Sequence, residues 1–341
     1  MPERDSGRLN RRALKAAQPL AALVELTYRC NWRCVFCYNP RHHDRHGLDA
    51  REWSEVIADL RELGTLNITV TGGEPLAHPE ALEILAAIRE RALTFRLFTN
   101  GALVTEAVAK RLFTLKPVAV ELSLHGSTAA IHDAATATPG SFDAMMRGLD
   151  RLLENGVPVL LKTPLTRLNE QDLDAMIGLV ESRGLPYTVD PTITPRDDGD
   201  LSPLAFRASP EGIERLYRRV APLGKLPIAR REAGGVNCGL GRTTVAVDPE
   251  GNVYPCPQWR KTALGNVRAT RLRDLWHPSP ERQRAAAVAI AANDRMLSEG
   301  GALADFPFCP AVALERSGDP LHIDDLTRTQ ADIAERVRST P

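Results

Sequence analysis

The sequence predicts an α/β fold in which six strand–helix repeats build a parallel sheet or barrel. Short apolar runs alternate with amphipathic stretches of helical periodicity. The repeats follow one another at intervals of about thirty residues, which is typical of βαβ units. The unusual motifs of the first half also come directly after expected strands, and barrels gather their chemistry at the carboxyl ends of strands.

The elements alternate regularly up to residue 190. The helix expected at 49–63, for example, places Trp53, Val56 and Leu60 at three- and four-residue spacing. Thr105 is expected to cap a helix, and Asn100-Gly101 to form a turn. We expect strands at 22–28, 67–71, 95–99, 118–124, 157–163 and 187–190. The intervening helices are expected at 49–63, 78–93, 105–115, 141–154 and 170–183.

The pattern changes after Pro191. Residues 192–210 are rich in proline, aspartate and glycine and indicate a linker or binding loop, and a short helix is expected at 211–221. Later segments predict a hairpin of strands 243–247 and 252–254, then helices at 272–276 and 280–292. We therefore expect a basic, frayed tail (1–20), a barrel (21–192), a linker with a short helix (193–233), a second region (234–315) and a C-terminal helix or tail (316–341).

Composition excludes several classes of protein. The chain has 341 residues, of which 43% are hydrophobic, so it can bury a sizeable core. Lys+Arg and Asp+Glu both number 43, so no net field attracts nucleic acid or an anionic membrane. The first twenty residues lack a long apolar run, and we expect neither a signal peptide nor a membrane span. A cytoplasmic location follows as an expectation.

Three cysteines stand close together after the first expected strand, in the segment Cys30-Asn-Trp-Arg-Cys34-Val-Phe-Cys37. An even number of cysteines can indicate disulfides in a secreted protein, but so tight a group is poor disulfide geometry. Thiolates are the usual ligands of iron–sulfur clusters. A 4Fe–4S cube has four iron corners, so three thiolates leave one iron open. An open metal position allows chemistry rather than electron transfer alone.

The cysteine group and the segment Gly72-Gly73-Glu74-Pro75 together resemble the radical S-adenosylmethionine (SAM) superfamily. The resemblance implies a partial (β/α)6 barrel in which Cys30, Cys34 and Cys37 hold a 4Fe–4S cluster. In that family the open iron binds SAM, and reduction cleaves SAM to methionine and a 5′-deoxyadenosyl radical that abstracts hydrogen from a substrate. A flavodoxin- or ferredoxin-type electron donor is the partner that such a reaction needs.

Further positions match those that bind SAM in the family. Gly72 and Gly73 permit a close backbone approach, although a strand-to-helix turn also needs glycine. The resemblance implies that Glu74 helps to fix the methionine amino group and that Phe36 lies near the adenine. It also implies contacts to the SAM carboxylate or ribose from Asn100 and Ser123, and Lys162 is expected to meet the SAM carboxylate or the substrate. The alternatives are a core aromatic for Phe36, a turn and a strand-end hydroxyl for Asn100 and Ser123, and a solvent-directed amine for Lys162.

Substrate-side chemistry has three candidates, which are Glu121, Asp190 and Lys162. Glu121 shares strand parity with Ser123 and is expected to face the barrel interior, where an unpaired carboxylate is costly. Asp190 ends the last expected strand of the repeats. His125 and His132 are candidates for proton transfer or for packing. The tract at 41–46 is interpreted as a solvated loop because its spacing is poor for zinc.

A second cysteine pattern follows in the other half. Cys238, twelve residues, Gly251, four residues and Cys256 resemble the start of the SPASM or "twitch" extension of radical SAM enzymes. A full SPASM region has seven cysteines, whereas here only Cys309 follows. We therefore expect one auxiliary 4Fe–4S cluster on Cys238, Cys256 and Cys309, with a fourth site that is open, filled by another ligand or taken by substrate. The alternative is three scattered buried thiols.

The resemblance implies an enzyme that modifies a ribosomally synthesised peptide, for example by crosslinking or epimerisation. A separate peptide-recognition protein could then assist it. The second interpretation is the biosynthesis of a small molecule or cofactor, such as a tetrapyrrole or quinone. A third, of another class, is a non-catalytic iron–sulfur electron carrier or sensor. The intact glycine motif favours an enzyme, because a carrier needs no SAM site.

Overall fold

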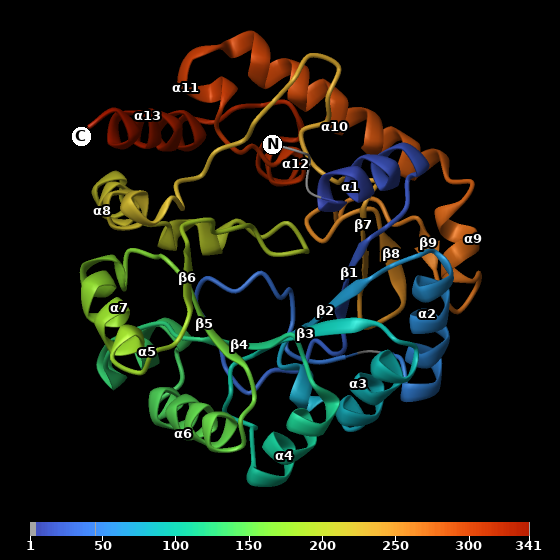
Figure 1. Ribbon diagram of the computed structural model, residues 1–341, viewed down its shortest axis with the longest axis vertical. Helices are drawn as coiled ribbons and strands as arrows, with labels where there is room; N and C mark the ends of the chain where they lie inside the picture. Colours follow the sequence, from blue (N-terminus) through green and yellow to red (C-terminus); the bar gives the residue numbers. More distant parts are fainter. Residues whose placement is uncertain (1–4, 45, 341) are drawn as a thin grey trace.

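The protein, described by a computed structural model over residues 5–44 and 46–340, is built on one nine-stranded sheet (Figure 1). The strand order is β6-β5-β4-β3-β2-β1-β7-β8-β9. All neighbours from β6 to β7 are parallel, and β8 and β9 continue the sheet in antiparallel pairs. The strands are β1 (Ala21–Glu25), β2 (Asn67–Thr71), β3 (Thr94–Thr99), β4 (Ala119–Ser123), β5 (Val159–Pro164), β6 (Tyr187–Asp190), β7 (Thr244–Val247), β8 (Asn252–Tyr254) and β9 (Gly265–Asn266).

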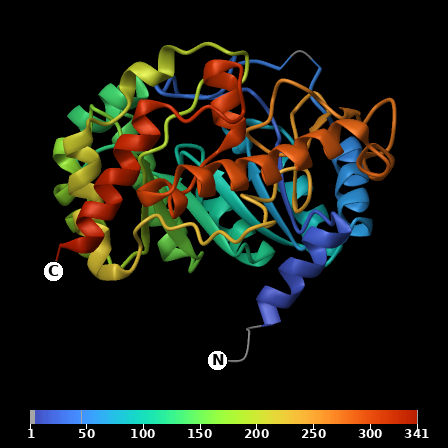
Figure 2. The ribbon, with the colours of Figure 1, turned by 90° about the horizontal axis from the view of Figure 1, so that it is seen from above.

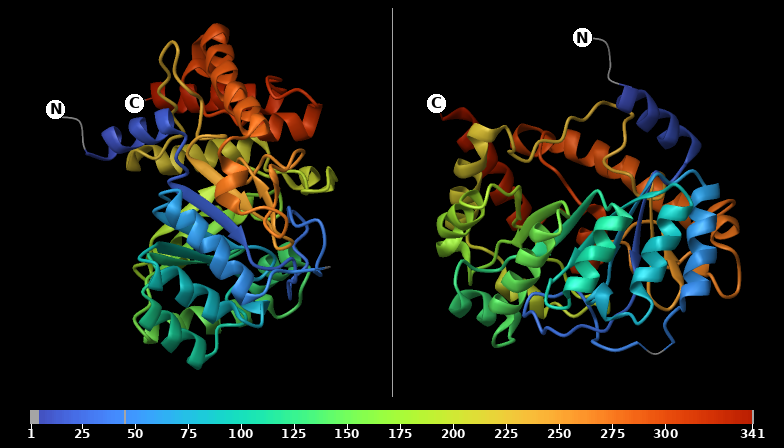
Figure 3. Two further views of the ribbon diagram at one scale, coloured as in Figure 1. Left: turned by 90° about the vertical axis from the view of Figure 1, so that its right-hand side faces the viewer. Right: turned by 60° about the horizontal axis from the view of Figure 1, so that its bottom comes forward.

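Helices cover both sides of this sheet, which confirms the predicted α/β class. The helices that follow β1 to β5 in the chain cross over between successive parallel strands and stand in a row along one side (Figure 3). The C-terminal helices lie on the opposite side (Figure 2). The helices are α1 (Asp5–Ala16), α2 (Ala50–Glu62), α3 (Ala81–Glu90), α4 (Glu106–Leu115), α5 (Ala129–Thr136), α6 (Ser141–Glu154), α7 (Leu173–Glu181), α8 (Pro210–Val220), α9 (Leu272–Trp276), α10 (Pro280–Glu299), α11 (Gly301–Ala304), α12 (Pro310–Ser317) and α13 (Asp325–Ser339).

The core forms where the strands meet the crossover helices. On β1, Ala22 and Val24 belong to the large apolar cluster that also contains Trp53 of α2 and Leu85 of α3. Because side chains alternate along a strand, Glu25 points to the other face of the sheet. Charged side chains can therefore stand on that inner face without disturbing the apolar layer, and this arrangement positions the site.

Most of the expected elements form close to their predicted bounds. Thr105 caps α4 by accepting a hydrogen bond from the Val108 amide. The helix expected at 78–93 is shorter, because a 3-10 turn over Pro75–Ala77 precedes α3. Helix α5 was not predicted. It has only eight residues, too few for a clear helical period.

The second half of the chain joins the sheet of the first half. The expected hairpin forms from β7 and β8, which pair antiparallel. In addition, β7 pairs parallel with β1, so that Ala21 stands opposite Thr244 and Val24 opposite Val247. Sequence patterns do not reveal a pairing across more than two hundred residues. The region after residue 234 thus extends the sheet beyond β1.

The expected frayed N-terminal tail is wrong for residues 5–16, which form α1. Residues 1–4 of that tail, and Pro341 of the C-terminal one, lie outside the described residues. Ala13 on α1 is fully buried. The Arg242 guanidinium donates a hydrogen bond to the Leu14 carbonyl (3.2 Å), and the Trp276 indole donates to the Ala17 carbonyl (2.7 Å). Contacts from the distant second half therefore order this helix.

A second apolar cluster lies among the C-terminal helices. Leu216 and Tyr217 of α8 pack there with Ala331, Ile333 and Val337 of α13. Figure 1 shows these helices side by side next to β6. Among the described helices, none combines the length and the apolar character that a membrane span requires.

Candidate functional site

The first three cysteines lie in the loop that follows β1. The amide of Cys37 donates to the carbonyl of Cys34 (3.1 Å), which forms a tight turn, and the Trp32 amide donates to the Cys30 sulfur (3.4 Å). The thiols are close enough for each thiolate to disfavour ionisation of another. Burial, the larger cause, raises the pKa of Cys30 to about 11. Binding to iron would therefore release protons from these thiols.

The donor set has the thiolate chemistry of iron–sulfur clusters. Across the described residues, no three His, Cys, Asp or Glu side chains converge closely enough to hold one metal ion. In a cubane each thiolate binds a different iron corner, so its ligands lie farther apart than those of one ion. All three cysteines are free and half-buried in one loop. They could hold three corners of a cluster.

Asp44 braces the start of the cysteine loop. Its carboxylate accepts hydrogen bonds from the Tyr28 amide (2.6 Å) and the Thr27 hydroxyl (2.5 Å), and its Oδ2 lies 3.3 Å from the guanidinium Nε of Arg29. Asp44 comes from the tract that we interpreted as a solvated loop. That interpretation did not include these contacts, because nothing in the sequence indicates that Asp44 bonds to residues 27–29.

Positions 72 and 73 require glycine because the backbone of Thr27 and Arg29 occupies the space that a Cβ would need. Gly72 has a φ of +134°, and a Cβ there would lie 2.4 Å from the Thr27 carbonyl oxygen. A Cβ on Gly73 would lie 2.3 Å from the carbonyl oxygen of Arg29. The Gly73 amide also donates to the Thr27 carbonyl (2.7 Å), and the Glu74 amide to that of Arg29 (2.7 Å). The glycine segment is thereby bonded directly to the start of the cysteine loop.

Glu74 connects the glycine segment to the end of β3. Its carboxylate accepts hydrogen bonds from the Leu76 amide (3.0 Å), the Thr99 hydroxyl (2.7 Å) and the Asn100 amide (2.7 Å). Burial raises the pKa of Glu74 to about 7, although these three donors oppose the rise. Through these hydrogen bonds Glu74 connects the carboxyl end of β2 to that of β3.

Asn100 completes the connection. Its side-chain amide donates to the Asn31 side-chain oxygen (2.7 Å) and lies 3.9 Å from the Cys30 sulfur, while its own side-chain oxygen accepts from the Ala102 amide (3.0 Å). Cys30, Gly73, Glu74 and Asn100 therefore belong to one bonded unit, although they are up to 70 positions apart in the chain.

We expect Glu74→Gln to lower the free energy of unfolding by about 1–3 kcal/mol. A glutamine offers one acceptor oxygen to three converging donors, so at least one buried donor loses its partner. Urea unfolding measures this. Glu83→Gln, an exposed change on α3, is the matched control and should shift stability by less than about 0.5 kcal/mol. Equal shifts for the two variants would contradict the bracing role.

Two buried histidines pack beneath the cysteine loop. His125 follows β4, and its ring meets Phe36 edge-on at 5.1 Å between ring centroids. His132 of α5 packs on Trp32 at 5.4 Å and accepts a hydrogen bond from the His125 amide (3.2 Å). Burial lowers the pKa of His132 to about 4 and that of His125 well below its usual value. Both rings are therefore neutral, and they pack against the aromatic residues of the loop.

This packing predicts acid sensitivity. Unfolded histidine binds a proton near pH 6.5, whereas folded His132 does so near pH 4, so the unfolded state binds more protons between these values. Stability should fall as the pH drops from about 6.5 to 4, by up to about 1.4 kcal/mol per pH unit for each histidine. Denaturant unfolding of His132→Gln should show a clearly shallower fall, and the exposed His322→Gln an unchanged one. A wild-type stability that does not vary over this range would contradict the prediction.

The inner face of the sheet carries a charged group on β3, β4 and β5. Glu121 is buried and paired, with its carboxylate 2.9 Å from Arg96 and 3.3 Å from Lys162. The Lys162 ammonium also lies over the Phe98 ring, 4.0 Å from its centroid. The pairing removes the expected cost of a lone carboxylate. Ser123, opposite Lys162 in the ladder, lies at the open end of β4.

Asp190 ends β6, away from this group. Its side chain accepts a hydrogen bond from the Thr192 amide (2.8 Å) and is exposed. It lines a cavity at the edge of the sheet, together with Cys309. The two predicted substrate-side carboxylates thus lie in different surroundings.

The other three cysteines come together from distant segments. Cys238 precedes β7, Cys256 follows β8, and Cys309 precedes α12. After burial, the main influence on the Cys256 thiol is the nearby Cys309, and Cys238 acts in the same direction, so its pKa rises to about 12. Cys309 is the exposed member of this set. These thiols could hold a second cluster.

A buried ion-pair group connects three regions of the chain. Arg260, four residues after Cys256, reaches Glu25 at the end of β1 (3.0 Å) and Asp197 in the segment after β6 (3.6 Å). The Arg260 and Glu25 side chains are only 5% and 1% exposed. Burial raises the pKa of Asp197 to about 8 against the opposing effect of Arg260. We did not predict this group, although an acidic residue within an apolar strand was a signal.

Comparison with known proteins agrees with this arrangement. Residues 24–180 match the family model described as the Radical SAM superfamily. Residues 238–297 match the SPASM model, described as an iron–sulfur cluster-binding domain. The chain therefore contains a radical SAM domain followed by a SPASM domain. The SPASM match contains Cys238 and Cys256, and the Radical SAM match contains every residue of the bonded unit around Cys30.

The similar proteins include a maturase and a peptide cyclase by their descriptions. Mycofactocin maturase MftC of Mycobacterium tuberculosis is 31% identical over 257 residues, covering 70% of this chain and 64% of that protein. PqqA peptide cyclase of Ruegeria pomeroyi is 27% identical over 340 residues, covering 92% of this chain and 88% of that protein. The chain spans 64% of the length of the maturase.

Solved structures share the fold. Streptococcus suis SuiB bound to S-adenosylmethionine aligns with a TM-score of 0.69 and 16% identity, covering 95% of this chain and 79% of that one. Native anSMEcpe with bound AdoMet and a peptide aligns with a TM-score of 0.68, also at 16% identity, covering 94% and 98%. At this identity the likeness concerns the fold alone, whereas the family models confirm the predicted radical SAM barrel and C-terminal SPASM region.

The cofactors of this family are a 4Fe–4S cluster and SAM, and the SPASM domain adds auxiliary iron–sulfur binding. The residues fit them. Each cysteine set provides three free thiols, which is the donor chemistry that iron–sulfur clusters require. The glycine segment is hydrogen-bonded to Thr27 and Arg29 at the start of the loop that carries the first set, so the two motifs lie together.

Proposed function

We propose that the chain is a radical SAM enzyme that modifies a ribosomally synthesised peptide. The observation that carries the proposal is the bonded unit of Cys30, Gly73, Glu74 and Asn100, because it joins a thiolate-rich loop to the family's SAM motif. An electron carrier does not bind SAM, so it does not require a SAM motif joined to its cluster loop. The maturase and cyclase relatives support a peptide substrate.

In this proposal Cys30, Cys34 and Cys37 hold the cluster. The reduced cluster and SAM, when bound, supply a 5′-deoxyadenosyl radical that abstracts hydrogen from the substrate. Glu74 and Asn100 keep the glycine segment and the cysteine loop in register. The remaining positions proposed to contact SAM are Gly72, Gly73, Phe36, Ser123 and Lys162.

The inner face of the sheet would hold the substrate. Glu121 fixes Lys162 and Arg96 by ion pairs, so these cations are oriented before any ligand binds. We propose Glu121 as the group that sets their positions and Asp190 as a substrate contact at the strand edge. The buried aromatic and histidine layer beneath the cysteine loop excludes water from that side.

Cys238, Cys256 and Cys309 are proposed to hold one auxiliary 4Fe–4S cluster, in a functional region at about 234–315. Its fourth ligand would come from another residue or from the substrate. A flavodoxin- or ferredoxin-type protein would supply electrons, and a separate protein could deliver the peptide. The six free thiols favour the reducing cytoplasm as the location.

The test of the substrate class uses the peptide encoded by the short reading frame nearest to this gene. We expect reconstituted, reduced protein with SAM to modify that peptide while forming 5′-deoxyadenosine; a crosslink is detected as a loss of hydrogen mass, and an epimerisation as deuterium taken up from D2O. The Cys34→Ala protein is the control and should leave the peptide unchanged. Turnover with a tetrapyrrole or quinone precursor, and not with the peptide, would overturn the peptide proposal.

A further inference from the structure

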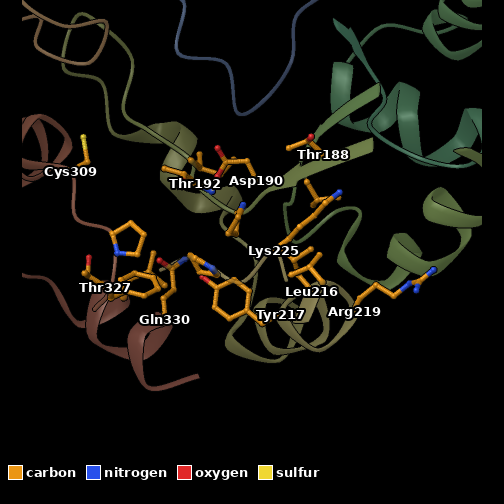
Figure 4. Close-up of a pocket in the computed structure, with 18 of the residues that line it drawn as sticks. Thr188, Asp190, Thr192, Leu216, Tyr217, Arg219, Lys225, Cys309, Thr327 and Gln330 are labelled. Carbon is orange, nitrogen blue, oxygen red and sulfur yellow. Dashed lines mark hydrogen bonds between the residues drawn. The ribbon is translucent and has the colours of Figure 1, made fainter. Parts of the chain in front are cut away.

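A cavity of about 760 Å³ opens along the free edge of β6. Figure 4 shows Thr188, Asp190 and Thr192 on one wall, with Leu216 and Tyr217 across from them. The cavity also reaches Cys309, the exposed member of the second cysteine set. This volume is within the range of about 300–1,000 Å³ that is common for ligand sites.

One edge of β6 has no strand beside it in the described parts of the chain. The other edge pairs with β5, where the Leu161 amide donates to the Pro186 carbonyl (3.0 Å) and the Leu165 amide to that of Asp190 (2.8 Å). Because carbonyls alternate in direction along a strand, those of Tyr187 and Val189 point away from β5. Unpaired edges of this kind can accept an additional strand.

The lining favours a peptide with an acidic residue. Most of the cavity walls are apolar, with side chains such as Val189, Val220 and Phe308. Two of the lining cations are already paired: Arg219 with Glu181 (2.9 Å) and Arg316 with Asp324 (2.8 Å). Lys225 is exposed, and the described chain gives it no ion pair. It is the lining cation that remains available to a carboxylate.

We propose that the substrate peptide binds in extended form along the free edge of β6 and pairs an acidic side chain with Lys225. This inference rests on the proposed function. Alternate peptide side chains would enter the cavity, because side chains of a strand alternate between its two faces. The peptide would then run past Cys309. Main-chain hydrogen bonds would provide affinity, and the cavity and Lys225 would provide selectivity.

The first experiment probes the full-length protein with a synthetic library of capped ten-residue peptides. One half of the library carries a single glutamate, and the other half a glutamine at the same position. We expect wild-type protein to retain the glutamate half about threefold more strongly, as for a partly exposed ion pair. Lys225→Glu should remove this preference, whereas Lys15→Glu, an equal charge change on exposed α1, should preserve it. Val220→Trp should fill the cavity and reduce all retention, and Phe113→Trp on exposed α4 should not.

The second experiment tests strand pairing itself. A retained peptide is resynthesised with N-methyl groups at its odd positions or at its even positions. Only one of the two sets should weaken binding, by about tenfold, because only alternate amides face β6. Equal binding of both sets, no retention by wild-type protein, or a chain that pairs with a second copy through β6 would overturn the inference. Conversion of SAM to 5′-deoxyadenosine without peptide is measured in parallel. If it persists while peptide retention fails, this inference fails alone; if it fails while retention persists, the proposed function fails instead.

Discussion

Replacing both Cys238 and Cys256 with alanine is expected to lower the iron content from about eight atoms per chain to about four. The expectation follows from two cubanes, each held by three of the six thiols. Cys256 lies near both Cys238 and Cys309, so the double replacement removes two of the three thiols of one set. The cysteine loop after β1 contains neither residue. Its cluster should therefore remain.

Iron and sulfide analysis of the anaerobically reconstituted protein gives the result directly. The reciprocal control replaces Cys30, Cys34 and Cys37, which should also leave about four iron atoms, on the second set. Replacing all six cysteines should leave none. An iron content that does not change after the Cys238 and Cys256 replacements would refute the auxiliary cluster.

Arg260→Met is expected to lower the free energy of unfolding by about 3–5 kcal/mol. The Arg260 and Glu25 side chains are 5% and 1% exposed, and Asp197 is 14% exposed. Removal of the guanidinium leaves two buried carboxylates close to each other and without their counter-ion. The loss should also separate the segment after Cys256 from the end of β1.

Urea unfolding at pH 7 checks this effect. Arg284→Met is the matched control, because Arg284 forms an ion pair with Glu281 at an exposed site, and its loss should cost less than about 1 kcal/mol. Adding Glu25→Gln to Arg260→Met should restore part of the stability, since it removes one of the unpaired charges. If Arg260→Met and Arg284→Met have the same effect, the buried pairing does not hold these segments together.

The local features of the fold could be predicted from the sequence. Helix α2 forms because Trp53, Val56 and Leu60 share one face and because Asp49 and Glu52 form a capping box at its start. Strand β2 follows from alternation in Asn67–Thr71, with Ile68 and Val70 buried. These properties depend on spacings of two to four residues, which a single sequence displays.

Features that depend on distant partners could not be predicted. The parallel pairing of β7 with β1, the ordering of α1 by Arg242 and Trp276, and the group formed by Arg260 and Glu25 all join residues more than two hundred positions apart. No local period indicates such contacts. The contacts of Asp44 with residues 27–29 could not be predicted either, because the cysteine loop separates these residues in the sequence and no local period indicates the contacts.

The glycine segment also has contacts within the chain that its sequence does not reveal. The sequence predicts that Gly72 and Gly73 permit the approach of a ligand. A Cβ at either position would also meet the backbone of Thr27 or Arg29. The glycines thus allow this segment to bond to the start of the cysteine loop, which is a further reason to treat the two motifs as one site.

The most direct test of the central claim measures 5′-deoxyadenosine formed from SAM by the reconstituted, reduced protein. The bonded unit around Cys30 predicts that the wild-type protein forms it, even without peptide, and that Cys34→Ala does not. Phe113→Ala, an exposed change on α4, should retain the activity. Iron-loaded wild-type protein that neither binds nor cleaves SAM would contradict the account.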